Sequence, residues 1–264
     1  MALGTELGPK FLQLMKRYCV DYVNAGDQSV TRDLMVEDYL LRMGLHEVRG
    51  RDTAYFDATA RQMTQYPNLQ LTVHEIATSG ERLMMRFSEH GRRAKDGKKC
   101  VWGGIGLYRW NGDVLLQCNV EQDYTSRHRQ IASGIPDPVD HPEVAPWDGD
   151  PELADQSAET VVRNWLNGGG LDITPTVLAD DAWCNGGQVP IFDQQDIEVI
   201  DLFSVGNRVG FHVRQFGRAV DNIGAIQKGG KASMFAIGIV HVAEGVVAKG
   251  RIIRNRMDIE PIAD

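Results

Sequence analysis

The stretch CVWGGIGLYRWNGDVLLQCNVEQDY, residues 100–124, has the pattern of two long strands joined by a tight turn. Apolar and polar side chains alternate on both sides of Asn111-Gly112, a dipeptide that favours the positive φ angles of a short hairpin loop. A hairpin with residues 69–75 and 82–89 as its strands, turning at Ser79-Gly80-Glu81, precedes it. The first half of the chain is therefore predicted to form an antiparallel sheet.

The second half of the chain repeats this arrangement. Residues 232–242 and 246–259 alternate around Glu244-Gly245 in the same way. The segment Gly104-Ile105-Gly106-Leu107 has a counterpart in Ala236-Ile237-Gly238-Ile239. Repetition of this kind indicates two copies of one plan.

Helical patterns precede the strands in each half. The side chains of Phe11, Met15, Tyr18 and Tyr22 fall on one face of a helix that ends near Gly26. Further helices are expected at residues 30–36, 52–65, 157–167 and 175–178. No third helix is expected in the second half, where residues 183–193 lead directly into the sheet, so the second copy is a reduced one. The fold class is α+β, with two tandem cone-like domains in which helices pack on a curved antiparallel sheet.

A proline-rich acidic strap separates the two halves. Residues 132–156 contain five of the ten prolines, seven acidic residues and no Lys or Arg. Proline excludes helix and central strand from such a stretch, and Trp147 suggests that it is pinned to a surface. The expected domains are therefore residues 1–131 and 157–264, joined by this strap.

Charge and composition restrict the possible partners. The 264 residues carry 28 Lys plus Arg against 36 Asp plus Glu, a formal charge of −8, which disfavours nucleic acid and membranes as partners. No apolar stretch is long enough to span a membrane, and no signal peptide pattern opens the chain. Four scattered cysteines are expected to be buried thiols, which suggests a cytoplasmic protein.

Four segments of the first half, in their order and spacing, resemble the nuclear transport factor 2-like superfamily, and in particular its ketosteroid isomerase and SnoaL-like polyketide cyclase branches. These segments are Leu14–Tyr18, Val23–Asp27, Val36–Asp38 and Arg49–Asp52. The resemblance extends over residues 8 to 125, with a weaker echo in residues 157 to 260. It implies the cone-like fold and a deep pocket, but the fold hosts many activities.

By this resemblance, some catalytic positions of the family are retained in this sequence and others are replaced. Tyr18 falls at the tyrosine that donates a hydrogen bond to the developing enolate in ketosteroid isomerases. The general base of that family falls on Met43, and its second acidic donor falls near Gly103. Neither residue can transfer a proton, which disfavours isomerisation of the family type. The histidine of the SnoaL-like branch falls on Arg42, with His46 four residues further on.

The strand of residues 114–124 presents an apolar face and a polar face that carries Asn119 and Glu121. The polar face can simply be solvated, but the resemblance places the equivalent face inside the cavity. A carboxyl group there would suit general acid or base catalysis. The predicted catalytic residues are Tyr18, His46, Asp38 and Glu121. The predicted substrate contacts are Tyr22, Tyr39, Arg42, Asn119, Trp102 and Arg61.

Other motifs are weak. The basic segment 90–99 has no phosphate-loop spacing and is expected to be a solvated hairpin tip. The seven histidines show no metal-ligand spacing, and no nucleotide or flavin motif is present, so neither a metal nor a cofactor is expected.

These observations favour a cofactor-independent lyase that eliminates water or formaldehyde from a hydrophobic, phenolic aromatic molecule. By resemblance, such chemistry is similar to that of the superfamily's dehydratases and its lyases for lignin-derived diarylpropanes. A SnoaL-like polyketide cyclase or ketosteroid-type isomerase is the first alternative, and a non-catalytic binding module is the second. Self-association into a homo-oligomer is compatible with either.

Overall fold

The computed structural model describes residues 3–169, 171, 174–179 and 190–262. The elements of the first half are α1 (Leu3–Arg17), η1 (Tyr18–Asn24), η2 (Gln28–Val30), α2 (Thr31–Leu34), β1 (Met35–Met43), β2 (His46–Arg49), η3 (Gly50–Tyr55), α3 (Phe56–Gln65), β3 (Gln70–Thr78), β4 (Arg82–Arg92), β5 (Lys99–Trp110), β6 (Leu115–Gln122) and α4 (Tyr124–Ser133). Those of the second half are α5 (Gln156–Gly169), β7 (Val177–Ala179), β8 (Phe192–Val205), β9 (Arg208–Ala219), β10 (Lys231–Ala243), β11 (Val246–Arg254) and β12 (Glu260–Pro261).

The two halves form two sheets with the same connectivity. The first has the strand order β2-β1-β6-β5-β4-β3, and the second has the order β7-β11-β10-β9-β8. In each sheet an early strand of the half pairs in parallel with a late one: β1 with β6, and β7 with β11. The long strands that lie between these two in the sequence pair with their neighbours in antiparallel fashion. This α+β architecture of two sheet-based halves agrees with the fold class that the sequence predicts.

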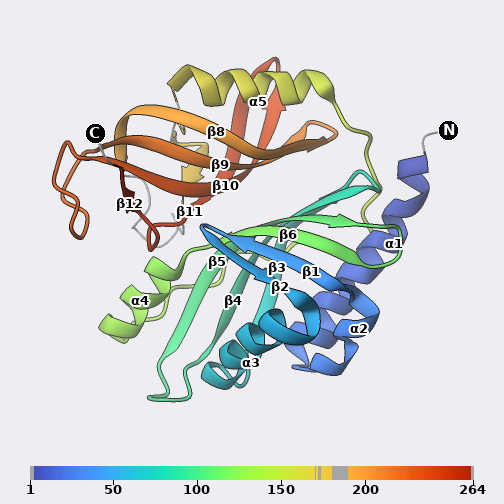
Figure 1. The fold of residues 1–264 in the computed structure, drawn as a ribbon. Helices are drawn as coiled ribbons and strands as arrows, with labels where there is room; N and C mark the ends of the chain where they lie inside the picture. Colours follow the sequence, from blue (N-terminus) through green and yellow to red (C-terminus); the bar gives the residue numbers. More distant parts are fainter. Residues whose placement is uncertain (1–2, 170, 172–173, 180–189, 263–264) are drawn as a thin grey trace.

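Each sheet has one face covered by helices and one face turned toward the other sheet (Figure 1). α5 packs on the second sheet, and α1 and η1 pack against β3 of the first. Between the sheets lies a cluster of buried apolar side chains: Ala77, Met84, Ile105, Leu107, Phe203, Val205, Ile237, Ile239 and Ile253.

The repeated segments explain this packing. Ile105 and Leu107 of β5 and Ile237 and Ile239 of β10 all belong to the cluster between the sheets. The alternating small residues face the other way, under aromatic rings: a Cβ on Gly106 would lie 2.7 Å from the Tyr108 ring. Alternation of large and small residues therefore gives each sheet an interface on one face and room for rings on the other.

Several local expectations need correction. Residues 175–178, expected to be a helix, contain the start of strand β7, because Val177 pairs with Gly250 of β11. The strand expected to reach Tyr124 ends at Gln122, and α4 begins at Tyr124 with the Asp123 carboxylate capping the Ser126 N–H. The stretch 183–193, expected to enter the sheet directly, falls largely outside the described residues.

The strap and the cysteines follow the expected pattern. Trp147 packs against the first core, and the His141 carbonyl lies 2.8 Å from Nδ1 of the buried His74. Cys19, Cys100 and Cys118 are buried free thiols, and Cys184 lies outside the described residues. Among the described helices, none is long and apolar enough to cross a membrane.

Candidate functional site

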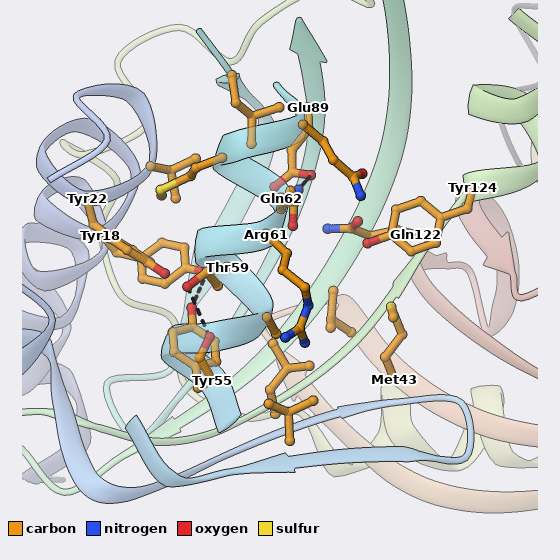
Figure 2. Close-up of a pocket in the computed structure, with 18 of the residues that line it drawn as sticks. Tyr18, Tyr22, Met43, Tyr55, Thr59, Arg61, Gln62, Glu89, Gln122 and Tyr124 are labelled. Atoms are coloured by element: carbon orange, nitrogen blue, oxygen red, sulfur yellow. Dashed lines mark hydrogen bonds between the residues drawn. The ribbon is translucent and has the colours of Figure 1, made fainter. Parts of the chain in front are cut away.

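A cavity of about 310 Å³ lies on the helix-covered side of the first sheet (Figure 2). Its wall is largely apolar, with a few polar groups, as is usual for small-molecule sites. The lining side chains are Tyr18, Tyr22, Val23, Leu41, Met43, Val48, Tyr55, Ala58, Thr59, Arg61, Gln62, Met63, Gln65, Leu69, Glu89, Val120, Gln122, Tyr124 and Arg127.

Tyrosine hydroxyls line one side of the cavity. At Tyr18 the N-terminal helix widens from α to π geometry, and the Tyr18 and Tyr55 hydroxyl oxygens lie 3.4 Å apart. The Tyr22 ring packs edge-on against Tyr18, and its buried hydroxyl lies near Thr59 without completing a hydrogen bond among the described residues. Burial raises the pKa of all three tyrosines, so they stay protonated and can act as hydrogen-bond donors.

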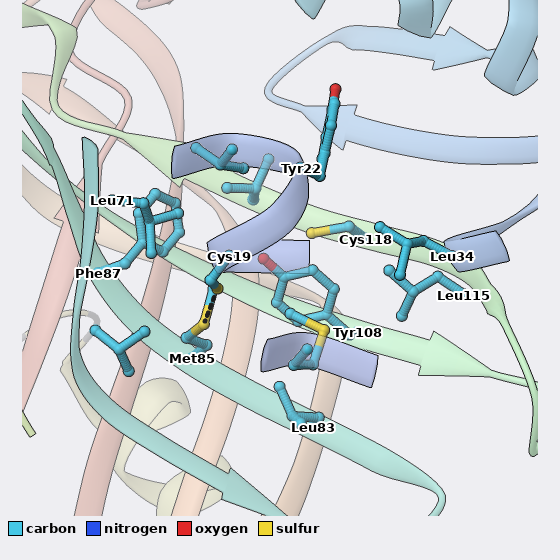
Figure 3. Packing of buried hydrophobic residues seen from close by; sticks show 14 of the residues in the cluster. Cys19, Tyr22, Leu34, Leu71, Leu83, Met85, Phe87, Tyr108, Leu115 and Cys118 are labelled. Atoms are coloured by element: carbon cyan, nitrogen blue, oxygen red, sulfur yellow. Dashed lines mark hydrogen bonds between the residues drawn. The ribbon is translucent and has the colours of Figure 1, made fainter. Parts of the chain in front are cut away.

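A layer of buried side chains supports this tyrosine wall from behind (Figure 3). Cys19 contacts Met85 of β4, with the two sulfur atoms 3.9 Å apart. The Tyr108 ring packs edge-on against Tyr18, with ring centroids 6.2 Å apart. Dense packing of this kind fixes the direction in which the hydroxyls point.

Glu89 of β4 is the carboxyl group of the cavity. Its side chain accepts a hydrogen bond from Gln62 Nε2 at 2.6 Å, and only 7% of the residue is exposed. Burial raises the pKa of Glu89 to about 7, although hydrogen bonding from Gln62 and the charge of Arg127 oppose the rise. Near neutral pH, Glu89 therefore exists in both protonation states and can give or take a proton.

Arg127 of α4 closes the same end of the cavity. Its guanidinium carbon lies 3.9 Å from the centre of the Tyr124 ring, 4.9 Å from that of Trp102 and 5.8 Å from that of Tyr66. Such cation–π contacts hold the planar group in place without neutralising it.

Three of the predicted site residues line the cavity: Tyr18, Tyr22 and Arg61. Tyr39 and Trp102 are buried just behind the lining. The Tyr39 ring packs edge-on against Tyr55 with centroids 5.0 Å apart, and Trp102 Nε1 donates to Gln122 Oε1 at 3.2 Å.

Asn119 and Glu121 lie on the other face of β6, between the two sheets, so the expectation that they point into the cavity is wrong. Glu121 accepts hydrogen bonds from the Gly44 N–H at 2.8 Å and from Asn255 Nδ2 at 2.9 Å, and it pairs with His212 Nε2 at 2.9 Å. Asn119 Nδ2 donates to Asp201 at 3.1 Å. The apolar face of β6 turns to the cavity instead, where Val120 contributes to the lining.

His46, Asp38 and Arg42 lie on the exposed β1–β2 hairpin, outside the cavity. Asp38 binds Arg49 at 2.6 Å and Arg42 binds Glu47 at 2.6 Å, so both side chains are engaged in ion pairs on this hairpin. The His46 side chain is 65% exposed and lies 3.6 Å from Asp258. The hairpin register explains the pair of Arg42 with Glu47, since it places these two residues directly opposite each other.

Sequence reasoning missed Glu89, although the strand pattern contains a signal for it. Leu83, Met85 and Phe87 occupy alternate positions of β4 and are buried in the first core. Glu89 continues the same face, so one carboxyl group ends an otherwise apolar row. In the described part of the chain, no group of three or more His, Cys, Asp or Glu side chains is arranged to hold a metal ion.

Among known protein families, a match falls in the first half of the chain. Residues 16–115 match the family model described as a SnoaL-like domain. A comparison with curated proteins finds no match.

Several solved structures are similar to about half of this chain. TsrD from Streptomyces laurentii is 22% identical, with a TM-score of 0.42, and the alignment covers 47% of this chain and 95% of TsrD. A candidate SnoaL-like polyketide cyclase from Jannaschia sp. CCS1 is 12% identical, with a TM-score of 0.45, covering 50% of this chain and 96% of its own. An NTF2-like protein of unknown function from Cytophaga hutchinsonii is 11% identical, with a TM-score of 0.36 and coverage of 44% and 98%.

Proposed function

With residues 16–115 forming a SnoaL-like domain, we propose that the chain is a cofactor-independent enzyme that transfers a proton on a small, hydrophobic, oxygen-bearing substrate. One observation carries the proposal: a buried carboxyl group with a pKa of about 7, Glu89, shares an apolar cavity with tyrosine hydroxyls. A proton acceptor and a set of oxyanion donors are the two parts that such a reaction needs.

In the proposed reaction the Glu89 carboxylate removes a proton from the bound substrate. The electron pair left behind moves toward a substrate oxygen, and the Tyr18 and Tyr55 hydroxyls donate hydrogen bonds to the charge that develops there. Protonated Glu89 then returns the proton to the product or to the leaving group. The low polarity of the cavity strengthens each of these interactions.

Glu89 replaces His46, Asp38 and Glu121 as the proposed proton carrier. The first two of those lie on the surface, and Glu121 is bound between the sheets on the far side of β6. Met43, which occupies the position of the isomerase base, does line the cavity, so Glu89 supplies from β4 the group that Met43 cannot supply.

Within this class, elimination of water or formaldehyde from a phenolic aromatic substrate, such as a lignin-derived dimer, is the favoured reaction. A row of tyrosine donors suits a phenolic oxygen that gains negative charge when the base removes its proton, before its electron pair expels the leaving group. Cyclisation or isomerisation of a carbonyl compound is the alternative, and the match to the SnoaL-like domain supports it. Both reactions require the same proton carrier and the same donors.

A generic elimination probe tests the pairing of base and donors. In 5-nitrobenzisoxazole a base removes one C–H proton as the N–O bond breaks, and the product is a coloured phenolate. The rate should rise with pH through about 7, where Glu89 loses its proton. Glu89→Gln should lower this rate at least about 100-fold, and Tyr18→Phe about tenfold.

Glu81→Gln is the matched control, because Glu81 is an exposed carboxylate in the turn before β4. It should leave the rate unchanged. An equal rate in Glu89→Gln and wild-type protein, for this probe and for a panel of phenolic and carbonyl substrates, would exclude Glu89 as the proton carrier.

A further inference from the structure

We propose that the cavity selects substrates that carry an anionic oxygen group, a carboxylate or a phenolate, and that Arg61 binds this group. The inference rests on the proposed use of the cavity as the substrate site. It adds the substrate's charge, which the acid–base mechanism does not require.

Arg61 is a cation without a counter-ion at the mouth of the cavity. It forms no hydrogen bond or ion pair with any residue that the structure describes. Asp57 precedes it by four residues on α3, a spacing at which helical ion pairs commonly form, yet no such pair is present. Figure 2 shows the Arg61 side chain extending from α3 into the space enclosed by the lining residues instead.

Cations outnumber carboxyl groups in the described lining of the cavity. Apart from tyrosines, the ionisable side chains in its described lining are Arg61, Arg127 and Glu89. Arg127 likewise forms no ion pair within the described residues, and its Nε atom is buried without a hydrogen-bond partner. Glu89 offsets only part of this charge, because its carboxyl group is partly protonated near neutral pH.

A neighbouring cavity of about 340 Å³ extends the positive region. Arg127 and Gln65 line both cavities, and Lys95 lines the second one, where Arg93 is paired with Asp96 and burial lowers the pKa of His128. The chain as a whole carries a formal charge of −8, so this concentration of cations is local. A positive potential focused at the mouth of a cavity attracts anions and repels cations.

The chemistry of the guanidinium group restricts the class of ligand that Arg61 can bind. Its planar N–H groups match the two oxygens of a carboxylate and can also donate to a single phenolate oxygen. Arg61 is exposed at the cavity mouth, so a neutral ligand leaves its charge to water and gains no charge-assisted hydrogen bond from it. An anionic ligand supplies the counter-ion that Arg61 lacks among the described residues.

Two matched pairs of probes test the proposal by binding alone. One pair is 4-nitrophenol and 4-nitroanisole, and the other is 3-phenylpropanoate and its methyl ester. Titrations at about pH 8, where both acids are ionised, should show at least one anion binding about tenfold more tightly than its neutral match. The absorbance of 4-nitrophenolate reports its ionisation directly, so the phenolate and carboxylate arms are distinguished.

Arg61→Gln should abolish this preference: it should weaken binding of the anion about tenfold and leave binding of the neutral probe unchanged. Arg163→Gln is the charge-matched control, because Arg163 is exposed on α5 of the other half. Glu89→Gln should keep the preference, so an unchanged elimination rate in this variant would count against the proposed function and not against this inference. If neither anion binds more tightly than its neutral match, or if Arg61→Gln leaves the preference intact, the inference is wrong.

Discussion

The carboxyl group of Glu89 is buried, where its charge is poorly solvated, so its ionisation affects the stability of the folded protein. Burial raises its pKa from 4.5 to about 7. Between these two pH values the folded protein holds a proton at Glu89 that the unfolded chain has already released. By linkage, the contribution of Glu89 to the free energy of unfolding decreases as the pH rises through this window.

Glu89→Gln should remove that penalty. At about pH 8 the variant is expected to be more stable than wild-type protein by about 3 kcal/mol, and the difference should vanish below about pH 4.5. Urea unfolding at a series of pH values measures both quantities, with Glu81→Gln as a variant that should follow the wild type throughout. A Glu89→Gln protein that is less stable than the wild type at about pH 8 would show that the carboxylate is stabilised by its surroundings.

The residues of the site differ in how far their position follows from the sequence. Tyr18 and Tyr22 were predicted because a helical repeat fixes which face they share, and both line the cavity. Glu89 was missed because a carboxyl group at the end of a strand normally reaches solvent. Its burial depends on Gln62 and Tyr124, which come from a helix before the strand and a helix after the sheet. The pattern of residues within one strand cannot predict contacts between segments so far apart in the sequence.

The strand β6 shows the same limit for a whole element. Its alternation correctly predicts two faces, but not which structure each face meets. The polar face is neither solvated nor inside the cavity, because its partners Asp201, His212 and Asn255 lie far along the chain, in the other half. The strand β7 was mistaken for a helix for a similar reason, since its pairing partner is β11. Helices and hairpins with strong local repeats, such as α5 and the β5–β6 hairpin, were predicted well.

The position of Glu121 separates a structural role from a catalytic one. Glu121→Ala should lower the free energy of unfolding by about 3 kcal/mol, because it removes the carboxylate that Asn255, the buried His212 and the half-buried Gly44 N–H bind. The rate with 5-nitrobenzisoxazole should stay within about twofold of wild type. Denaturant unfolding and the rate assay on one preparation measure both, with Glu37→Ala, on the exposed side of β1, as the control. A large loss of rate at unchanged stability would restore the catalytic assignment of Glu121.

At the scale of the whole molecule, the two sheets share an interface that is apolar in the centre and charged around it. Ile105 and Ile237 belong to the central cluster. Around them, Arg82 binds Asp201 at 2.6 Å, and Arg256 binds Asp123 at 2.5 Å. Burial of apolar surface provides most of the driving force for such packing, and the ion pairs fix the orientation. The second half therefore covers the face of the first sheet opposite the cavity, and it holds β6 in place from behind.

This arrangement predicts that the two halves unfold together. Amides of β5 and β10 should exchange hydrogen with the same free energy of opening in the wild-type protein, because neither sheet keeps its inner face covered alone. Ile237→Asp buries a charge in the centre of the interface, so it should destabilise the protein by about 3–5 kcal/mol and lower the free energy of opening of β5 and β10 by the same amount. Val246→Asp is the matched control, because Val246 is 59% exposed at the end of the same hairpin. Hydrogen exchange followed by mass spectrometry resolves the two strands. Separate exchange of β5 and β10 in the wild-type chain would mean that each half is stable on its own, and that the second half is not needed to hold the cavity in shape.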